Sequence, residues 1–212
     1  YFLLGLILRR VSSWLTVGWR HTTSEAVRTM VRPSFAFMAF PLGNAFKNQG
    51  MLTLVGIALG PGVAVGFNTM RTLVNAAQQA MSLINTAVWP EISAAFGAGN
   101  LPLARRLHRL SCNASFWLAL CALLVLFTIG PLIFKFWTLD DLQFDKLFFS
   151  MMLFIMFVNS FWYSSSVVQA ATNTHGTMAL LYLSTTVVAL GLAYLLTSLL
   201  GLQGIAIGLI VL

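Results

Sequence analysis

The sequence predicts an all-α, polytopic transmembrane helix bundle. Hydrophobic residues make up 58% of its 212 residues and charged residues only 8%, whereas soluble domains carry roughly 25% charged residues. The mean hydropathy is +0.86. Apolar runs of the length that a bilayer requires, about 20 residues, recur between short polar connections. Helices are the expected spanning elements because they satisfy their backbone hydrogen bonds internally.

The chain contains seven apolar runs, five of which are long enough to be complete spans. Residues 1–8 are expected to be the end of a truncated transmembrane helix, and residues 9–32 a basic linker. A bundle is predicted over 33–212, with a second truncated span starting at Gly204. The five complete spans are expected near 33–51, 62–89, 110–136, 147–171 and 178–200.

The basic residues alternate between connections and thereby orient the bundle. Five arginines lie in the linker 9–32, and Arg105, Arg106 and Arg109 lie in the connection after the second complete span. By the positive-inside rule both arginine-rich connections are predicted to be cytoplasmic. The net charge of +7 resides mostly in these short connections. Binding to nucleic acid is therefore not expected.

Prolines and glycines mark the expected breaks and contacts. Pro33 is expected to open its span, Pro41 predicts a kink or local unwinding near 37–41, and the segment 90–102 is expected to break the helix. A basic helix should then start near Leu103 and enter the membrane at Leu110. Three Gly-x-x-x-Gly pairs are interpreted as packing motifs. They are Gly56 with Gly60, Gly62 with Gly66, and Gly204 with Gly208.

A polar stripe runs along the span 62–89. Its members are spaced alternately by three and four residues and are Asn68, Arg71, Asn75, Gln78, Ser82 and Asn85. At 3.6 residues per turn they occupy a sector of roughly 100°. A guanidinium at bilayer depth costs about 3 kcal/mol on insertion scales, so this face is expected to avoid lipid. We favour a hydrated cavity wall over hydrogen bonding between helices, which gives about 0.6 kcal/mol per bond.

A second stripe is predicted on the span 147–171. Asn159, Tyr163, Ser166, Gln169 and Asn173 fall within a sector of roughly 120°. The two stripes can oppose each other across one cavity. Arg71 keeps two interpretations at this point: an anion-binding group, or a charge satisfied by helix carbonyls and neighbouring asparagines.

Other polar and aromatic residues receive simpler interpretations. Lys47 is expected to extend to water at the outer interface, and Trp89, Trp117, Trp137 and Trp162 to form an aromatic belt. His21, His108 and His175 are expected to be solvated or to face headgroups. No carboxylate lies within the predicted spans, and no metal-ligand cluster or nucleophile–base pair stands out. We therefore predict no catalytic residue, metal or cofactor, and a protein that is not an enzyme.

Short motifs follow one another along the chain, and they are Arg28 to Pro33, Phe40-Pro41, Leu59-Gly-Pro61, Phe67-Asn-Thr-Met-Arg71, Val88-Trp-Pro-Glu-Ile-Ser93, Gly97-Ala-Gly-Asn100, Ala104-Arg-Arg106 and Gly201-Leu-Gln-Gly204. Together they resemble the second half of a lipid-linked oligosaccharide flippase, from the polysaccharide-biosynthesis branch of the multidrug, oligosaccharidyl-lipid and polysaccharide exporter superfamily. The resemblance implies one half of an alternating-access transporter, built from two repeats with a midplane site.

The resemblance further implies flipping of an undecaprenyl-pyrophosphate-linked sugar unit across the bacterial inner membrane, with Arg71 facing the pyrophosphate. The expected partners are the lipid-linked oligosaccharide, membrane lipids, the N-terminal half of the transporter and polysaccharide polymerases. The expected substrate-binding residues are Arg71, Asn68, Asn75, Gln78, Asn85, Asn159, Tyr163 and Gln169.

Three alternatives remain. A cation-coupled multidrug exporter of the same superfamily would need a counter-charge for cationic drugs, and the predicted spans hold no acid. A membrane glycan polymerase or ligase would be expected to place Arg, His or Glu in a sizeable outer loop, whereas the outer loop 135–146 is short and lacks all three. A non-transporting scaffold would leave both stripes without a purpose.

Overall fold

The computed structural model describes residues 23–212, without the side chains of residues 32 and 33. The predicted span 1–8 and most of the linker 9–32 lie outside the described residues. No strand occurs in the described part, which consists of helices and short turns. The predicted all-α class is thereby confirmed.

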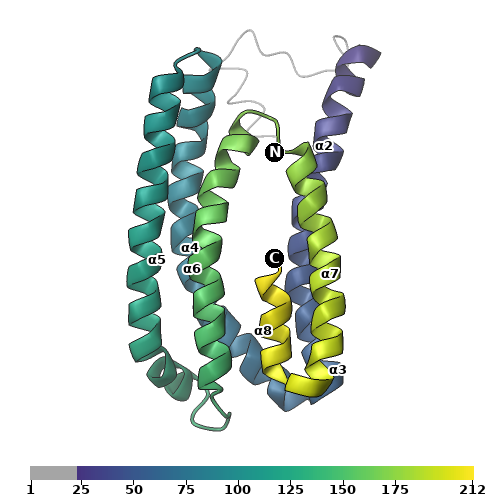
Figure 1. Ribbon diagram of the computed structural model, residues 1–212, viewed down its shortest axis with the longest axis vertical. Helices are drawn as coiled ribbons and strands as arrows, with labels where there is room; N and C mark the ends of the chain where they lie inside the picture. The colour runs from purple at the N-terminus through teal and green to yellow at the C-terminus, as the bar shows by residue number, and fades with distance from the viewer. Residues whose placement is uncertain (1–22) are drawn as a thin grey trace, which may run out of the picture. The chain divides into compact units, whose positions relative to one another are not determined.

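The helices follow one another with short connections (Figure 1). Their bounds are α2 Ser24–Ala45, a π-helical turn Phe46–Gly50, α3 Met51–Leu59, α4 Pro61–Gly97, α5 Leu101–Trp137, α6 Lys146–Ala171, α7 Gly176–Leu200 and α8 Leu202–Ile210. The chain divides into two units after Phe35. The arrangement described below is that of the second unit, Ala36–Leu212.

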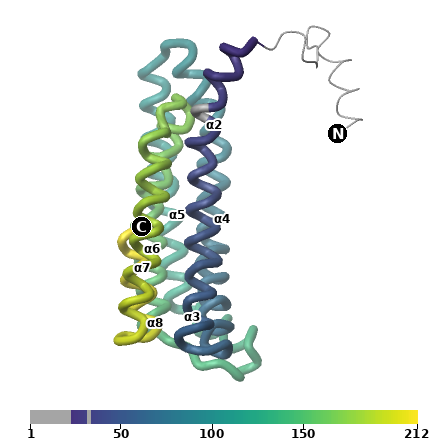
Figure 2. The backbone as a smooth tube through the Cα atoms, turned by 90° about the vertical axis from the view of Figure 1, so that its right-hand side faces the viewer, coloured from purple at the N-terminus to yellow at the C-terminus, as the bar shows by residue number. Residues whose placement is uncertain are grey.

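Within this unit α4, α5 and α6 pack side by side, and α8 folds back along α7 and also contacts α6 (Figure 1). The part of α2 after residue 35 continues through the π-helical turn into α3 along one course (Figure 2). The helix α3 packs against both α4 and α7. The unit is thus a bundle of antiparallel helices joined by tight turns.

Local sequence explains most helix ends. Gly60, with φ of 93°, precedes Pro61 at the start of α4, where a missing backbone donor is harmless. The Asn100 side chain accepts a hydrogen bond from the Leu103 amide at 3.1 Å and caps α5. Asp145 caps α6 through the Phe148 amide at 2.9 Å. Gly201, with φ of 60°, makes the turn between α7 and α8.

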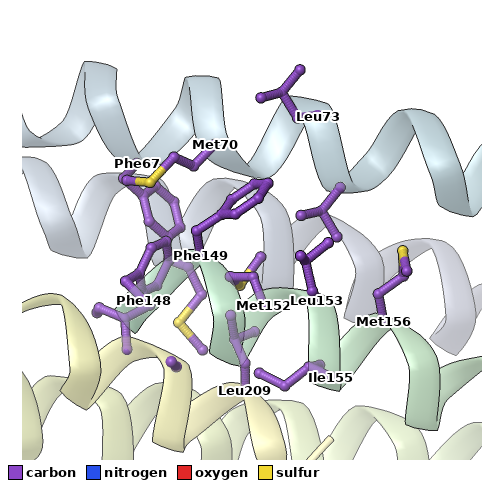
Figure 3. Close-up of a cluster of buried hydrophobic side chains, with 14 of the residues drawn as sticks. Phe67, Met70, Leu73, Phe148, Phe149, Met152, Leu153, Ile155, Met156 and Leu209 are labelled. Atoms are coloured by element: carbon purple, nitrogen blue, oxygen red, sulfur yellow. The ribbon is translucent and has the colours of Figure 1, made fainter. Parts of the chain in front are cut away.

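A core of aromatic and sulfur-containing side chains joins α4, α6 and α8 (Figure 3). The rings of Phe67 and Phe148 lie 5.5 Å apart between centroids. Phe149 and Leu153 of α6 are buried, and Leu209 reaches the same cluster from α8. This packing fixes the distance between α4 and α6, the two helices that carry the polar stripes.

Several predicted boundaries are wrong. Residues 24–32 are helical instead of linker, and Pro33 lies inside α2. Thr23 caps the start of α2, because its Oγ1 accepts a hydrogen bond from the Ala26 amide at 3.2 Å. The break expected at 37–41 occurs instead at Phe46–Gly50, as a π-helical turn.

The helix α4 also continues through Pro90 to Gly97. Tertiary packing outweighs the lost backbone donor there, since Ile92 is buried and the Ser93 hydroxyl donates to the Ala171 carbonyl at 3.0 Å. The next helix starts at Leu101, two residues before the predicted start, and runs without interruption to Trp137.

Three helices between residues 23 and 212 are long and apolar enough to cross a membrane, namely α5, α6 and α7. The helix α4 is long enough but not apolar enough, because its polar stripe lowers its mean hydropathy. The long run from α2 to α3 is divided by the π-helical turn. These lengths and compositions identify a membrane protein.

Candidate functional site: a polar cavity between the helices

Most members of the two polar stripes line one cavity of about 650 Å³. The helix α4 contributes Asn75, Gln78, Gln79, Ser82, Asn85 and Thr86, and α6 contributes Asn159, Ser160, Tyr163 and Ser166. The remaining walls come from α2, the π-helical turn, Tyr182 of α7 and the terminal Leu212. The predicted opposition of the two stripes therefore exists in the fold.

A small side pocket of about 30 Å³ adjoins the cavity. Lys47, Asn48, Asn75, Gln78 and Asn159 line both spaces. Arg71 lines the side pocket and not the main cavity. The cationic end of the site is thus a recess beside the cavity.

The guanidinium of Arg71 has three specific contacts. Its Nη1 donates to the backbone carbonyl of Asn48, and its Nη2 donates to Oδ1 of Asn68 at 2.8 Å. Its central carbon lies 5.2 Å from the centroid of the Phe67 ring. Within the described chain Nε is buried without a partner. The interpretation as a charge satisfied by a carbonyl and an asparagine thus applies to Nη1 and Nη2, whereas Nε has no partner within the described residues.

Lys47 does not extend away to the interface as expected. It lines both the cavity and the side pocket, so two cations share one recess. Among the described residues the only ion pair is Lys135 with Asp140, at 2.9 Å on the exposed surface. The recess therefore carries positive charge with no carboxylate against it. Lys47 and Asn48 follow Asn44 by three and by four residues, and this spacing could have placed Lys47 on a common face with Asn44.

Aromatic side chains form the wall near α7. The rings of Trp162 and Tyr182 stack, with centroids 5.6 Å apart and an interplanar angle of 24°. The Tyr182 hydroxyl donates to Oδ1 of Asn44 at 2.9 Å. Trp89 also lines the cavity. Trp89 and Trp162 thus lie on the cavity, and the aromatic-belt interpretation is wrong for them. These rings present flat apolar faces with polar tips.

Asn85 holds a buried position in the cavity wall, with 2% of its surface exposed. The Ser111 hydroxyl of α5 donates to its Oδ1 at 3.0 Å. Its Nδ2 has no partner within the described residues. A donor of the stripe is therefore held in a fixed place at the end of the cavity remote from Arg71 along α4.

Four further residues depart from their expected places. Asn68 lines neither the cavity nor the side pocket. Gln169 is exposed and does not line the cavity, because the lining of α6 passes through Val167 and Ala170 instead. Asn173 lies beyond α6 in the following turn, with φ of 57°. His175 is only 6% exposed and packs against the Phe37 ring at 5.5 Å, so the solvated interpretation is wrong.

No group of three or more His, Cys, Asp or Glu side chains that could hold a metal ion occurs over residues 23–212. The polar atoms of the cavity are mainly amides and hydroxyls, with one ammonium group. These groups suit reversible binding of a polar ligand through hydrogen bonds and charge.

No family model and no curated protein matches the chain. A solved structure does match: the crystal structure of the MATE P26A mutant, with a TM-score of 0.76 at 15% sequence identity. The match covers 99% of this chain and 48% of that one. The chain therefore spans about half the length of that protein. Its fold resembles the fold of that half.

Proposed function

We propose that the chain forms half of a bacterial inner-membrane flippase for a lipid-linked oligosaccharide, an undecaprenyl-pyrophosphate-linked sugar unit. One observation carries the proposal: a membrane-exporter fold encloses a polar cavity with a recess for an anion beside it. Its volume of about 650 Å³ lies in the range of small-molecule sites, about 300–1,000 Å³.

The cations of the recess suit a pyrophosphate bound at its mouth, since the recess itself, of about 30 Å³, is too small to hold that group. Lys47 and Arg71 line the recess together, and Arg71 keeps its buried Nε free of any partner within the described residues. Guanidinium groups bind phosphate oxygens through charge-assisted hydrogen bonds, and ammonium groups bind them as point charges. Asn68 positions the guanidinium through its 2.8 Å hydrogen bond.

The main cavity matches the sugars. Asn75, Gln78 and Asn159 supply amide donors and acceptors next to the recess, and Tyr163 lies further along α6. The stacked pair Trp162 and Tyr182 adds an apolar face. A sugar unit presents both hydroxyl groups and apolar ring faces, so this mixed lining suits it better than a purely apolar wall would.

The proposal also covers the partners of the chain and its orientation in the membrane. The chain would work with the rest of its transporter, with membrane lipids and with polysaccharide polymerases that use the flipped substrate. The arginine-rich connections would face the cytoplasm, because basic loops are retained on that side.

The test replaces the two cations separately in the complete transporter and measures surface glycan together with lipid-linked oligosaccharide in the inner membrane. Lys47→Ala and Arg71→Ala are expected to deplete the surface glycan and to cause the lipid-linked precursor to accumulate. Lys135→Ala is the matched control, because its ammonium is exposed and pairs with Asp140. Normal glycan levels in both cavity variants, with normal membrane insertion, would refute the proposal.

A multidrug exporter is the second candidate, favoured by the structural likeness to MATE and by the aromatic wall. Two uncompensated cations beside the cavity argue against cationic drugs, which they would repel. Efflux of ethidium from cells distinguishes the candidates. Efflux that requires Trp162 and is unaffected by Lys47→Ala would establish the drug exporter.

A further inference from the structure

Asn85 is the one cavity residue whose amide is both buried and incompletely bonded. Its exposure is 2%, and Nδ2 has no partner within residues 23–212. A buried donor without an acceptor is costly, and native structures nearly always satisfy such groups. Because Asn85 lies in the cavity wall, the missing acceptor is best supplied by a molecule in the cavity.

The neighbouring helix fixes the orientation of this amide. The Ser111 hydroxyl donates to Oδ1 at 3.0 Å from α5. With Oδ1 occupied, Nδ2 is the group left to bind a ligand, and only an acceptor atom satisfies it. Sugar hydroxyl oxygens and acetamido carbonyls are acceptors of this kind.

The position of Asn85 along α4 sets the distance that a ligand must span to reach both Asn85 and Arg71. Fourteen residues separate Arg71 from Asn85 on one helical face, which corresponds to roughly 21 Å along the axis. The polar residues between them, Asn75, Gln78 and Ser82, line the cavity. A diphosphate with a single sugar is too short to bridge that distance, whereas a chain of several sugars bridges it.

We infer that Asn85 is a second subsite that selects for oligosaccharide length, by binding an acceptor oxygen on a sugar remote from the pyrophosphate. This inference rests on the proposed function and adds a distal contact to it. Substrates with one sugar would bind only through the recess and its adjacent amides. Substrates with several sugars would bind additionally through Nδ2 of Asn85.

The experiment measures binding by titration calorimetry with the complete transporter in detergent. The probes are citronellyl pyrophosphate-linked chitooligosaccharides containing one, two, three or four N-acetylglucosamine residues. The variants are Asn85→Leu and Asn85→Asp. The aspartate variant keeps the side-chain shape and the oxygen that accepts from Ser111, but it replaces the Nδ2 amide group. Thr128→Val is the matched control, since Thr128 of α5 lies outside the cavity lining and its hydroxyl is bonded to the Leu124 carbonyl at 2.9 Å.

In the unmodified protein, affinity is expected to increase with sugar number and to show its largest step when the chain reaches Asn85. Both Asn85 variants should weaken the longest probe by about tenfold, the size of one hydrogen bond, and leave the one-sugar probe unchanged. Thr128→Val should change neither. If Asn85→Leu fails to fold, Asn85→Asp gives the same comparison.

Two kinds of result would overturn the inference. The first leaves the flippase proposal standing, and the second refutes it too. Equal affinity for short and long probes, or equal weakening of all probes by Asn85→Asp, would remove the length-selecting subsite and leave the flippase proposal intact. Absence of binding by every pyrophosphate-linked probe would refute both.

Discussion

Arg71 of α4 donates a hydrogen bond from Nη1 to the backbone carbonyl of Asn48, which lies in the π-helical turn Phe46–Gly50. A π-helical turn departs from the regular backbone bonding of an α-helix, and such turns occur frequently at functional sites. The cation of the recess thus also holds the irregular part of the neighbouring helix. Nε of the same guanidinium has no partner within the described residues and leaves that contact in place.

The first prediction concerns the pair Arg71 and Asn68. Arg71→Ala should lower the thermal midpoint of the purified transporter, because a hydrogen bond to a charged group contributes about 1.5–3 kcal/mol. Asn68→Ala should lower it less, since the Asn48 contact remains. A double-mutant cycle should give a coupling energy of about 0.5–3 kcal/mol. Strictly additive effects of the two substitutions would contradict the bond at 2.8 Å.

The second prediction concerns the glycines of α8. A Cβ atom at Gly204 would lie 2.5 Å from the Leu196 carbonyl, and one at Gly208 would lie 2.7 Å from Cβ of Ala193. Gly204→Ala should therefore cost about 1–3 kcal/mol or more by overpacking, measured as a lower thermal midpoint and faster proteolysis.

Gly191→Ala on α7 is the control for this second prediction, because nothing lies within 4 Å of the added atom. It should be neutral or stabilising by up to about 1 kcal/mol. Equal tolerance at Gly204 and Gly191 would show that α8 does not pack on α7 as described.

The third prediction separates the two contacts of Tyr182. Tyr182→Phe removes the hydrogen bond to Asn44 and keeps the ring, so it should lower stability by about 0.5–1.5 kcal/mol. Trp162→Ala removes the stacked partner and should weaken binding of the chitooligosaccharide probes as well. Tyr182→Phe should leave that binding nearly unchanged. Loss of binding in Tyr182→Phe alone would mean that the hydroxyl, and not the ring, contacts the sugar.

The fourth prediction tests the proposed orientation by cysteine labelling. Cys112 and Cys121 are free thiols and are first replaced by alanine. In intact spheroplasts, a membrane-impermeant maleimide should label Asp141→Cys in the connection between α5 and α6. Leu101→Cys, at the start of α5, should react only after permeabilisation. The reverse pattern would invert the orientation of the bundle.

Helix periodicity made the cavity walls predictable. The recurrence of polar residues every three or four positions placed Asn75, Gln78 and Asn85 on one face of α4, and Asn159 and Tyr163 on one face of α6. Both faces line the cavity because neither suits lipid. The helical character of every complete span followed from the same physics.

Other parts of the site depend on tertiary packing and left no such signal. Tyr182 comes from a helix whose periodicity shows no polar face, and only the packing of α7 brings it opposite Trp162. Gln169 follows the stripe in sequence, but its side chain is exposed and lies outside the cavity wall. Arg71 lines the recess, and its bond to Asn48 depends on a π-helical turn that propensities do not reveal.

The π-helical turn has a consequence for the phase of the long run from α2 to α3. One additional residue in a helix rotates everything before it by about 100° relative to everything after it. In this structure Phe37, Phe40 and Asn44 line the cavity, and Met51 and Val55 are buried in the core. Deleting one residue from Phe46–Gly50 would restore a regular α-helix. Either the first set would then rotate away from the cavity, or the second set would rotate away from the core. A single inserted residue thus allows one continuous helix to line the cavity with its first part and to pack in the core with its second part.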